Sequence, residues 1–337
     1  MNQQSFGSRR RPTMDDVARK AGVSRALVSI VVRHAPGASE ETRRRVDAAA
    51  EELGYQPDVR AQSLAGQRSR VIGMMFGLSA GTFHIDLVDE TFAAAEARGH
   101  NVIMAPLTRT RNEAVAARAL QGFRFDALIM LNPPTRDPHL AGKIPVAVVG
   151  WHVDHPDVDV VRHSDELGMA AAVDHLVTLG HRDIAHIDGG DQAISDARRS
   201  AYLAAMRRHG LAGYVRVSPG GQSQMSGVAG ALMLCSDAQP PTALIAYNDD
   251  VAVAAMGVFI QRGLRIPDQI SVVGYDDADV GDLSPVPLTT VAQRPHELVR
   301  LAVERLIARV EHQRIVDREI VLDIKLKVRS STAPPRR

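Results

Sequence analysis

Residues 13–33 read TMDDVARKAGVSRALVSIVVR, and they predict two short helices joined by a glycine turn. Asp15 and Asp16 place negative charge in the first turn of the first helix, where the helix dipole favours it. Apolar residues then recur at helical spacing until Gly22, which is typical of a helix end. Ser24 follows as the cap of the second helix. A helix, a tight turn and a second helix form a geometry that fits a DNA groove.

The second helix divides into an inner and an outer face. Four apolar side chains are expected to pack on the first helix: Leu27, Val28, Val31 and Val32. The outer face is then left to Arg25, Ala26, Ser29 and Arg33. This layout is that of a recognition helix.

A third helix is expected beyond this pair, from its cap Ser39 to about Leu53. Its first half holds three arginines at residues 43–45, which either include a contact to a DNA backbone or form an ordinary charged face. Pro57 then interrupts the chain. The segment 58–66 is compatible with a helix but too short to be stable alone, so it is interpreted as a hinge.

The composition is that of a folded protein with more than one domain. The 337 residues suit two or three domains, and a hydrophobic content of 45% provides for large cores. The one cysteine, Cys235, excludes an internal disulfide. Residues 1–68 carry 12 Lys+Arg against 8 Asp+Glu, whereas the remainder carries 28 against 31, so contact with phosphates is expected at one end only. With neither a bilayer-spanning stretch nor an apolar signal segment, we expect a cytoplasmic, nucleoid-associated protein.

From Val71 onward, short apolar runs alternate with amphipathic segments, which is typical of parallel sheets covered by helices on both faces. Strands are expected at 71–76, 101–105, 127–131, 146–149, 184–187, 243–247 and 271–275. Helices are expected at 86–98, 113–120, 166–179, 198–209, 249–261 and 295–311. Two sets of such units suggest paired α/β lobes with a cleft between them, and ligands bind such sheets at the carboxyl ends of the strands.

An ordered set of motifs resembles the LacI/GalR family of transcriptional regulators over nearly the full chain. In the first part these are residues 13–33, Glu40-Glu41-Thr42-Arg43, Leu53-Gly54-Tyr55-Gln56-Pro57 and Ala61-Gln62-Ser63-Leu64. In the body they are residues 180–187, 248–252, 266–277 and 287–291. A helix-turn-helix pattern alone is moderately specific, whereas this ordered set is highly specific.

The resemblance implies a helix-turn-helix head and an α/β two-lobed core like that of periplasmic binding proteins. The expected parts are a disordered basic tail at 1–11, a DNA-binding domain at 12–57, a hinge helix and linker at 58–68, and an effector-binding and dimerisation core at 69–337. One lobe would comprise about 69–162 and 291–320, and the other about 163–290 and 321–337. The resemblance implies no catalytic residue, metal or cofactor.

The resemblance also implies a homodimer that places recognition helices in successive major grooves of a near-palindromic operator. Arg25 and Ala26 would read bases, and Arg25 either donates two hydrogen bonds to guanine or touches only phosphate. Leu64 would wedge into the minor groove, or else pack one head against the other. The further expected DNA contacts are Thr13, Ser24, Ser29, Arg33, Arg43 and Ala61.

Three positions depart from the common family pattern. Leu27 stands where threonine is usual, Ile30 where arginine or histidine is common, and Arg33 where asparagine is usual. Leu27 cannot donate a hydroxyl hydrogen bond to phosphate, and Ile30 cannot donate to guanine. The docking mode is therefore carried over, but the operator sequence and the target genes are not.

In this family a small molecule between the lobes controls DNA binding. Arg198 matches the arginine that grips it, and three more polar side chains follow predicted strands: Asn132, Asn248 and Asp276. An arginine, amides and a carboxylate suit a sugar or a nucleoside. Phe83 and Trp151 are either aromatic platforms or buried, and His84 and His163 either line the cleft or cap loops. The effector's identity and the sign of its action stay open, and a dimer is favoured over a tetramer because no heptad repeat follows the core.

Other classes of function have weaker support. Residues 151–157 contain two histidines and two aspartates, but they resemble a connecting loop without a second ligand cluster. Asp249-Asp250 and Asp276-Asp277 suggest acid/base carboxylates less well than helix caps and ligand hydrogen bonds. Neither a dinucleotide-binding nor a phosphate-binding glycine loop is present. A transport-type sugar-binding protein shares the two-lobed core but would need an export signal in place of the basic helical head.

Overall fold

The computed structural model describes residues 12–32, 36–55, 68–77, 81–108, 110–133 and 141–336. The chain forms two compact units, Met1–Ser69 and Arg70–Arg337. The expected tail at 1–11, nearly all of the hinge at 58–68, and the DNA contacts assigned to Arg33, Ala61 and Leu64 lie outside the described residues.

The first unit contains three helices, α1 (Met14–Ala21), α2 (Arg25–Val32) and α3 (Glu40–Leu53). Thr13 and Asp16 form a capping box at the start of α1, and Gly22 ends it with φ 64°. Gly54 ends α3 in the same left-handed conformation, with φ 63°. The buried side chains of the three helices form one small core: Val17, Ala18, Ala21, Val28, Val31, Val46 and Ala49.

Leu27 does not take the place that the sequence predicted for it. Val28 and Val31 are buried and Val32 packs at the edge of the core, but Leu27 is half-buried and lies outside it. At about 100° per residue, Leu27 lies at the border of the stripe centred on Val28 and Val31. It therefore adds to the outer surface of α2.

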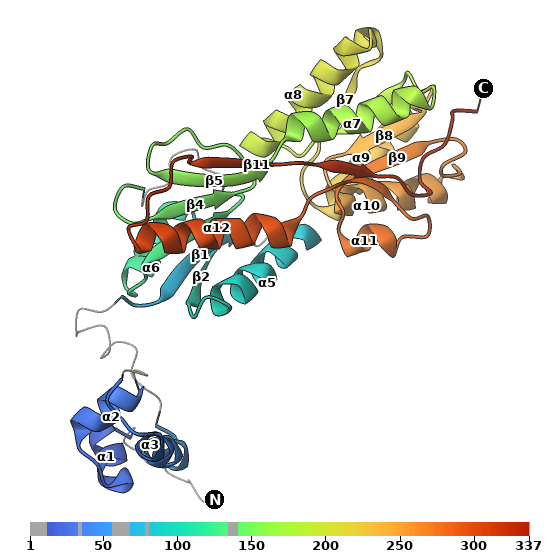
Figure 1. Ribbon diagram of the computed structural model, residues 1–337. Helices are drawn as coiled ribbons and strands as arrows, with labels where there is room; N and C mark the ends of the chain where they lie inside the picture. The colour runs from blue at the N-terminus through green and yellow to red at the C-terminus, as the bar shows by residue number, and fades with distance from the viewer. Residues whose placement is uncertain are drawn as a thin grey trace, which may run out of the picture. The chain divides into compact units, whose positions relative to one another are not determined.

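The second unit has two lobes, each built on a six-stranded sheet (Figure 1). The first sheet has the order β11-β5-β4-β3-β1-β2, and all its paired strands are parallel. Its strands are β1 (Val71–Gly77), β2 (Asn101–Leu107), β3 (Ala127–Leu131), β4 (Val146–Val149), β5 (Val158–His163) and β11 (Glu319–Leu322). The second sheet has the order β12-β10-β9-β8-β6-β7, and β12 alone of its strands pairs antiparallel. Its strands are β6 (Ile184–Ile187), β7 (Arg216–Ser218), β8 (Ala243–Ala246), β9 (Ser271–Asp276), β10 (Thr289–Ala292) and β12 (Lys325–Lys327).

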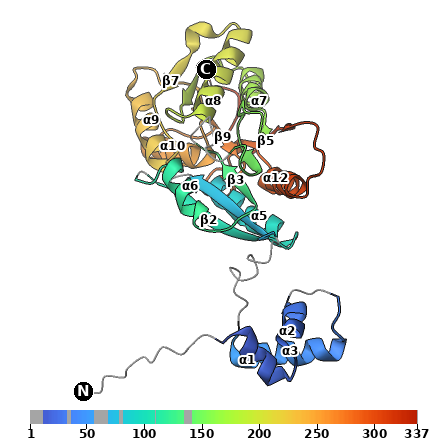
Figure 2. The same cartoon turned by 90° about the vertical axis from the view of Figure 1, so that its left-hand side faces the viewer.

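Helices cover both faces of each sheet (Figure 2). In the first lobe, α5 (Thr82–Glu96) and α12 (Pro295–Val310) cover one face and α6 (Glu113–Gln121) the other. In the second lobe, α7 (Asp165–Thr178) and α8 (Ala193–Arg208) lie on one face, and α9 (Gln224–Ser236) and α10 (Asp249–Gln261) on the other. A short helix, α11 (Asp279–Asp282), and a 3₁₀ turn, Ala212–Tyr214, complete the second lobe. Coverage on both faces explains why every residue of β3 is buried, since alternate side chains enter different cores.

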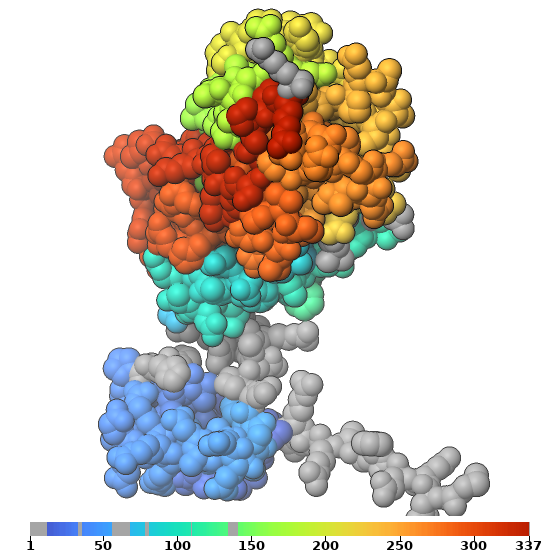
Figure 3. Space-filling model, turned by 90° about the vertical axis from the view of Figure 1, so that its right-hand side faces the viewer, coloured from blue at the N-terminus to red at the C-terminus, as the bar shows by residue number. Residues whose placement is uncertain are grey.

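The chain passes between the lobes after β5, after β10 and after β11. Its C-terminal part consequently lies on the surface of both lobes (Figure 3). β10 pairs with β9 through Ala292, and β11 pairs with β5 through Leu322. Each strand thus continues, paired within its own sheet, about two residues beyond the lobe boundaries expected at about 290/291 and 320/321.

The expected strands and all helices expected within the described residues are present, with two shifts that affect the candidate site. α5 begins at Thr82 rather than residue 86, so Phe83 lies on a helix and not in a loop. α8 begins at Ala193 rather than residue 198, which places Arg198 inside the helix. The sequence analysis did not predict β5, β7, β10, β11, β12, α9 or α11.

Candidate functional site

The outer surface of α2 presents the side chains that the sequence assigned to DNA. Arg25 and Ala26 are exposed, and Ser29 is half-buried. Arg25 Nε lies 3.7 Å from Asp15 Oδ1 on α1, and the two side chains are 67% and 60% exposed. An ion pair between two such exposed side chains is weak, so the Arg25 guanidinium remains available to a stronger partner.

Other polar side chains of the head hold its helices. Ser24 Oγ accepts a hydrogen bond from the Leu27 amide at 3.2 Å, and the Thr13 hydroxyl donates to Asp16 at 2.7 Å. Arg45 Nη2 donates to the carbonyl of Ala21 at 2.6 Å and so caps the end of α1. Arg43 is half-buried and Arg44 is exposed. Of the three arginines at 43–45, Arg45 therefore has a structural role.

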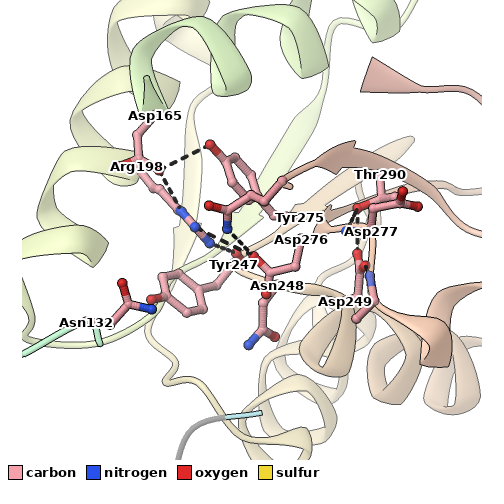
Figure 4. Close-up of polar contacts among 12 residues, drawn as sticks. Asn132, Asp165, Arg198, Tyr247, Asn248, Asp249, Tyr275, Asp276, Asp277 and Thr290 are labelled. Carbon is pink, nitrogen blue, oxygen red and sulfur yellow. Dashed lines mark hydrogen bonds and ion pairs between the residues drawn. The ribbon is translucent and has the colours of Figure 1, made fainter. Parts of the chain in front are cut away.

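In the second unit, polar side chains gather around Arg198 near the carboxyl ends of β8 and β9 (Figure 4). We call the following set the Arg198 cluster: Asp165, Arg198, Tyr247, Asn248, Tyr275 and Asp276. Arg198 Nε donates to Asp165 Oδ1 at 3.0 Å, Nη1 donates to the carbonyl of Tyr247 at 2.7 Å, and Nη2 lies 3.7 Å from Asp276 Oδ1. Arg198 is only 2% exposed, so its charge is balanced by buried carboxylates rather than by water.

Two tyrosine rings flank the guanidinium. Its central carbon lies 3.6 Å from the ring centre of Tyr275 and 4.8 Å from that of Tyr247. The Tyr275 hydroxyl donates to Asp165 at 3.1 Å, and burial raises its pKa well above the usual value. Cation–π contact and charge-assisted hydrogen bonds thus fix Arg198 in one position.

Asp276 ends β9 in an unusual backbone conformation, with φ 118°. Its Oδ1 accepts a hydrogen bond from Gln293 Nε2 at 2.7 Å. Burial raises the pKa of Asp276 to about 7, although Arg198 and Gln293 act in the opposite direction. This carboxyl group is therefore partly protonated near neutral pH.

The Asp249 side chain fixes the loop that follows Asp276. Its carboxylate accepts hydrogen bonds from Thr290 Oγ1 at 2.7 Å and from the Ala278 amide at 2.8 Å. A Cβ at Gly274 would lie 2.0 Å from Asp249 Oδ1, so only glycine fits there. The Asp249-Asp250 and Gly274–Asp277 motifs thus position the end of β9. Their carboxylates do not form an exposed acid/base pair.

Asn248 has a structural role as the cap of α10. Its Oδ1 accepts from the Val251 amide at 2.9 Å, and its Nδ2 donates to the carbonyl of Gln222 at 3.1 Å. Both ends of the amide are engaged, because α10 begins directly after β8 and its first amides require an acceptor.

The first lobe contributes a second polar group. Asn132 follows β3 with φ 45°, and its Nδ2 lies 2.9 Å from His84 Nε2. A Cβ at Gly150 would lie 1.6 Å from Asn132 Oδ1, so this approach requires glycine. Burial and the charge of Arg198 lower the pKa of His84 to about 4, which keeps the ring neutral at physiological pH.

One carboxylate joins the two lobes directly. Asp250 Oδ2, on α10 of the second lobe, accepts hydrogen bonds from the Thr82 amide at 2.8 Å and the Thr82 hydroxyl at 3.0 Å. Thr82 is the first residue of α5, whose own cap residue, Gly81, supplies no side-chain bond. The second lobe therefore caps a helix of the first.

His163 ends β5 and is 2% exposed. Neither of its ring nitrogens has a hydrogen-bond partner within the described part of the chain. Burial lowers its pKa to about 4, as do the charges of Arg294 and Arg198, whereas the nearby Gln293 side chain acts in the opposite direction. His163 is thus a buried, neutral imidazole beside Arg198 and Gln293.

The two aromatic candidates are part of the cores. Phe83 is 4% exposed among apolar side chains of α5, α12 and the first sheet. Trp151 is 8% exposed, packs with Tyr247 and Ile194, and donates from Nε1 to the carbonyl of Pro133 at 2.9 Å. Trp151 also lines a pocket together with His152, Asp154 and Ala193. Both aromatic side chains are therefore mostly buried in the cores.

Three members of the Arg198 cluster were not predicted from the sequence, Asp165, Tyr247 and Tyr275, and neither was Gln293, which donates to Asp276. Tyr247 directly follows β8, and Gln293 directly follows β10. Because ligands bind such sheets at the carboxyl ends of the strands, Gln293 would have been a candidate ligand residue if β10 had been predicted. Asp165 gave no functional signal in the sequence, because an acidic residue directly after a helix cap is common and interacts favourably with the helix dipole.

Across the described residues, no three His, Cys, Asp or Glu side chains converge as a metal site would require. The helices in the same ranges include none with the length and apolar content of a membrane span.

Comparisons with known proteins agree for both units. A family described as "Bacterial regulatory proteins, lacI family" matches residues 13–58, and a "Periplasmic binding protein-like domain" matches residues 173–332. The chain is 30% identical to the probable HTH-type transcriptional repressor ExuR of Bacillus subtilis over 95% of this chain and 98% of that protein. It is 31% identical to the ribose operon repressor of Escherichia coli over 95% and 99% of the two chains.

Solved structures give the same result. The lac repressor dimer bound to operator and the anti-inducer ONPF matches with a TM-score of 0.85 and 30% identity, covering 96% of this chain and all of that one. The complex of the transcriptional regulator CelR with cellobiose matches with a TM-score of 0.70 and 29% identity, covering 95% and 100% of the two chains.

Proposed function

Because the chain belongs to the lacI family of bacterial regulatory proteins, we propose that its head reads an operator through α2 and that the Arg198 cluster receives a small-molecule effector. As a family member it is a DNA-binding transcriptional repressor and not an enzyme. It acts as a dimer on operator DNA, as the lac repressor in its solved complex does. Such a protein works in the cytoplasm, where it associates with the nucleoid.

The DNA-binding assignment is supported by the exposed side chains of α2. Arg25 and Ala26 are the base-reading residues, and the weakly paired Arg25 guanidinium donates to guanine O6 and N7. Ser24, Ser29, Thr13, Arg43 and Arg33 contact the DNA near them, while Ala61 and Leu64 act at the minor groove. Since Leu27 and Ile30 are apolar, the operator differs from the common family sequence at the bases near them.

The effector assignment rests on one observation above all: a buried arginine with an adjacent carboxyl group and an imidazole without partners at the ends of the strands. Arg198, Asp276 and His163 contact the ligand, with Asn132 and His84 on the side of the first lobe. Asn248 acts through α10, and Phe83 and Trp151 shape the walls. The ligand is a sugar or a nucleoside, and the protein needs no metal or cofactor for this role.

A selection experiment tests the DNA-reading proposal. Full-length protein and the Arg25→Ala variant are each used to enrich random duplexes, and the consensus sequences are compared. The parent protein is expected to enrich a near-palindrome, and the variant should lose a guanine preference at one position in each half-site, which costs about 1–3 kcal/mol of discrimination. An identical consensus for both proteins contradicts direct readout by Arg25, and enrichment of no sequence contradicts the proposed function itself.

A further inference from the structure

We propose that Asp15 of α1 is a positioning residue for base readout: its carboxylate orients the Arg25 guanidinium of α2 toward guanine. This inference rests on the proposed function, because it assumes that Arg25 donates to guanine in the operator. It goes beyond that function by adding a residue that acts through Arg25 and not through a base. The sequence alone gives Asp15 only a local role, as an acid in the first turn of α1.

The start of α1 does not need Asp15 as a cap. Asp16 forms the capping box with Thr13, and it accepts from the Thr13 amide at 2.8 Å and from its hydroxyl at 2.7 Å. The same carboxylate contacts Arg19 Nη1 at 3.2 Å. Asp16 thus meets the hydrogen-bonding need of the helix start, and Asp15 is left 60% exposed with Arg25 as its ion-pair partner.

The position of Asp15 is unfavourable for DNA binding unless the carboxylate has a partner there. Its Oδ1 lies 3.7 Å from Arg25 Nε, so in the proposed function it is on the side of the head that faces the duplex. A negative charge on this side repels phosphates and lowers the affinity for any DNA. Among the described residues no other cation pairs with Asp15, since Arg19 and Lys20 of α1 pair with other carboxylates. The repulsion is therefore offset through Arg25.

The contact uses the part of the guanidinium that a guanine does not need. Nε faces Asp15, whereas Nη1 and Nη2 of Arg25 make no hydrogen bond within the described part of the chain. Two parallel donors of this kind match the O6 and N7 acceptors of guanine. An exposed arginine samples many rotamers, so a carboxylate that restrains Nε reduces the side-chain entropy lost when the base is bound.

The strength of this ion pair depends on whether DNA covers it. In the free protein both side chains are more than half exposed, and such a pair is weak in water. In a groove, water is displaced and the same two charges attract one another more strongly. Asp15 therefore leaves Arg25 available in the unbound protein and holds it when the head meets its operator.

Binding of the full-length protein to defined duplexes tests this role. The duplexes are the selected operator, the same operator with adenine in place of the guanine whose preference Arg25→Ala loses, and a random duplex. The ratio of the first two affinities is the base discrimination. Asp15→Asn removes the charge and keeps the size of the side chain. Its discrimination should fall about two- to fivefold for each half-site changed, the range of an exposed ion pair, while its affinity for the random duplex should rise because a repulsive charge is lost.

Three further variants separate positioning from other roles. Asp15→Glu keeps the charge and should keep most of the discrimination. Asp47→Asn, at an exposed position of α3, removes the same charge from the same unit and is the matched control, which should discriminate like the parent. In the Arg25→Ala background, Asp15→Asn should have no further effect on discrimination, because the two residues act through one contact.

Parent-like discrimination by Asp15→Asn would overturn the inference, since the carboxylate would then only repel phosphates. An effect that persists in the Arg25→Ala background would overturn it too, since Asp15 would then contact a base itself. Loss of binding to every duplex would assign Asp15 to the fold of the head, with the same consequence. If Arg25→Ala selects the same consensus as the parent, readout by Arg25 is wrong and the inference falls with the proposed function. That failure is distinguishable, because it appears in a variant with Asp15 intact.

Discussion

Arg198 illustrates how one residue can organise a site. It is buried on α8, and its partners come from the start of α7, the end of β8 and the end of β9. A charge this deep is tolerated because Nε and Nη1 donate hydrogen bonds and two carboxylates, Asp165 and Asp276, lie close to the guanidinium. The same contacts that fix Arg198 also make its removal costly, so an effect on stability must be separated from an effect on ligand binding.

Replacement of Arg198 tests both effects at once. Arg198→Met should abolish the effector response and lower the free energy of unfolding by about 3–5 kcal/mol, because Asp165 and Asp276 lose their buried partner. Urea unfolding and operator titration measure the two quantities. Arg207→Met, in the exposed last turn of the same helix, should change neither. An unchanged dose response of the Arg198 variant would argue against this residue as a ligand contact.

Asp276 makes the stability of the protein depend on pH. The folded protein holds this proton up to about pH 7, whereas the unfolded chain releases it near pH 4, so the folded state loses relative stability as pH rises between these values. Asp276→Asn removes this term. The stability of the variant relative to the parent should therefore rise by about 1.4 kcal/mol per pH unit from pH 4 to 7 and then level off.

Urea midpoints measured from pH 4.5 to 8 give this relative stability. The exposed Asp317→Asn variant serves as the control and should follow the parent throughout. A constant difference between Asp276→Asn and the parent across the range would contradict the raised pKa.

Among the elements, α5 is unusual because its first turn depends on the opposite lobe. Its amide at Thr82 is satisfied by Asp250 of α10, and the same first turn carries His84, which meets Asn132 at the end of β3. The start of α5 thus contacts both lobes, whereas the rest of the helix packs on the first sheet beside α12. A change in the distance between the lobes would therefore alter the cap of this helix.

Asp250→Ala tests this coupling. Loss of the carboxylate leaves the Thr82 amide without its partner, and the amides at the start of α5 should exchange hydrogen faster by a factor that corresponds to about 1–3 kcal/mol. Hydrogen exchange of the full-length protein measures the effect. Gln224→Ala removes a neighbour of the other carboxylate oxygen only and should leave α5 protected. Equal protection in the parent and the Asp250 variant would show that α5 does not depend on the second lobe.

At the scale of the whole molecule, the two units divide the work. The DNA-reading surface lies within Met1–Ser69 and the Arg198 cluster within Arg70–Arg337. Neither unit alone can make DNA binding depend on a ligand. Regulation therefore requires that ligand binding in the second unit favours one state of the whole dimer over another.

This coupling must be reciprocal. If the effector changes the affinity for operator DNA by a given factor, saturating operator must change the affinity for the effector by the same factor. Isothermal titration of the full-length dimer with the effector, with and without operator DNA, measures the second factor, and fluorescence anisotropy of labelled operator measures the first. A factor of one in both titrations, with the effector still bound, would contradict control of DNA binding by this ligand.

The sequence by itself determined those features that depend on neighbouring residues. The first helix of the head ends at Gly22 and the third runs from its cap Ser39 to Leu53, as the sequence predicts, because caps and left-handed glycines act within one turn of the chain. The long apolar strands were also predictable, since burial on both faces gives a continuous hydrophobic run. The candidate ligand residues at strand ends followed from the same periodicity.

Only the tertiary structure decided which of those residues meet. Thr82 and Asp250 are 168 positions apart, and no local signal connects them. The sequence marked Arg198 as a candidate ligand residue, but its contacts with Asp165 and the carbonyl of Tyr247 were not predictable, because they depend on how α7, α8 and β8 pack. The strands β7, β11 and β12 were missed because they lie at sheet edges and are partly exposed, so they lack the continuous apolar run of the equally short but fully buried β4, β6 and β8.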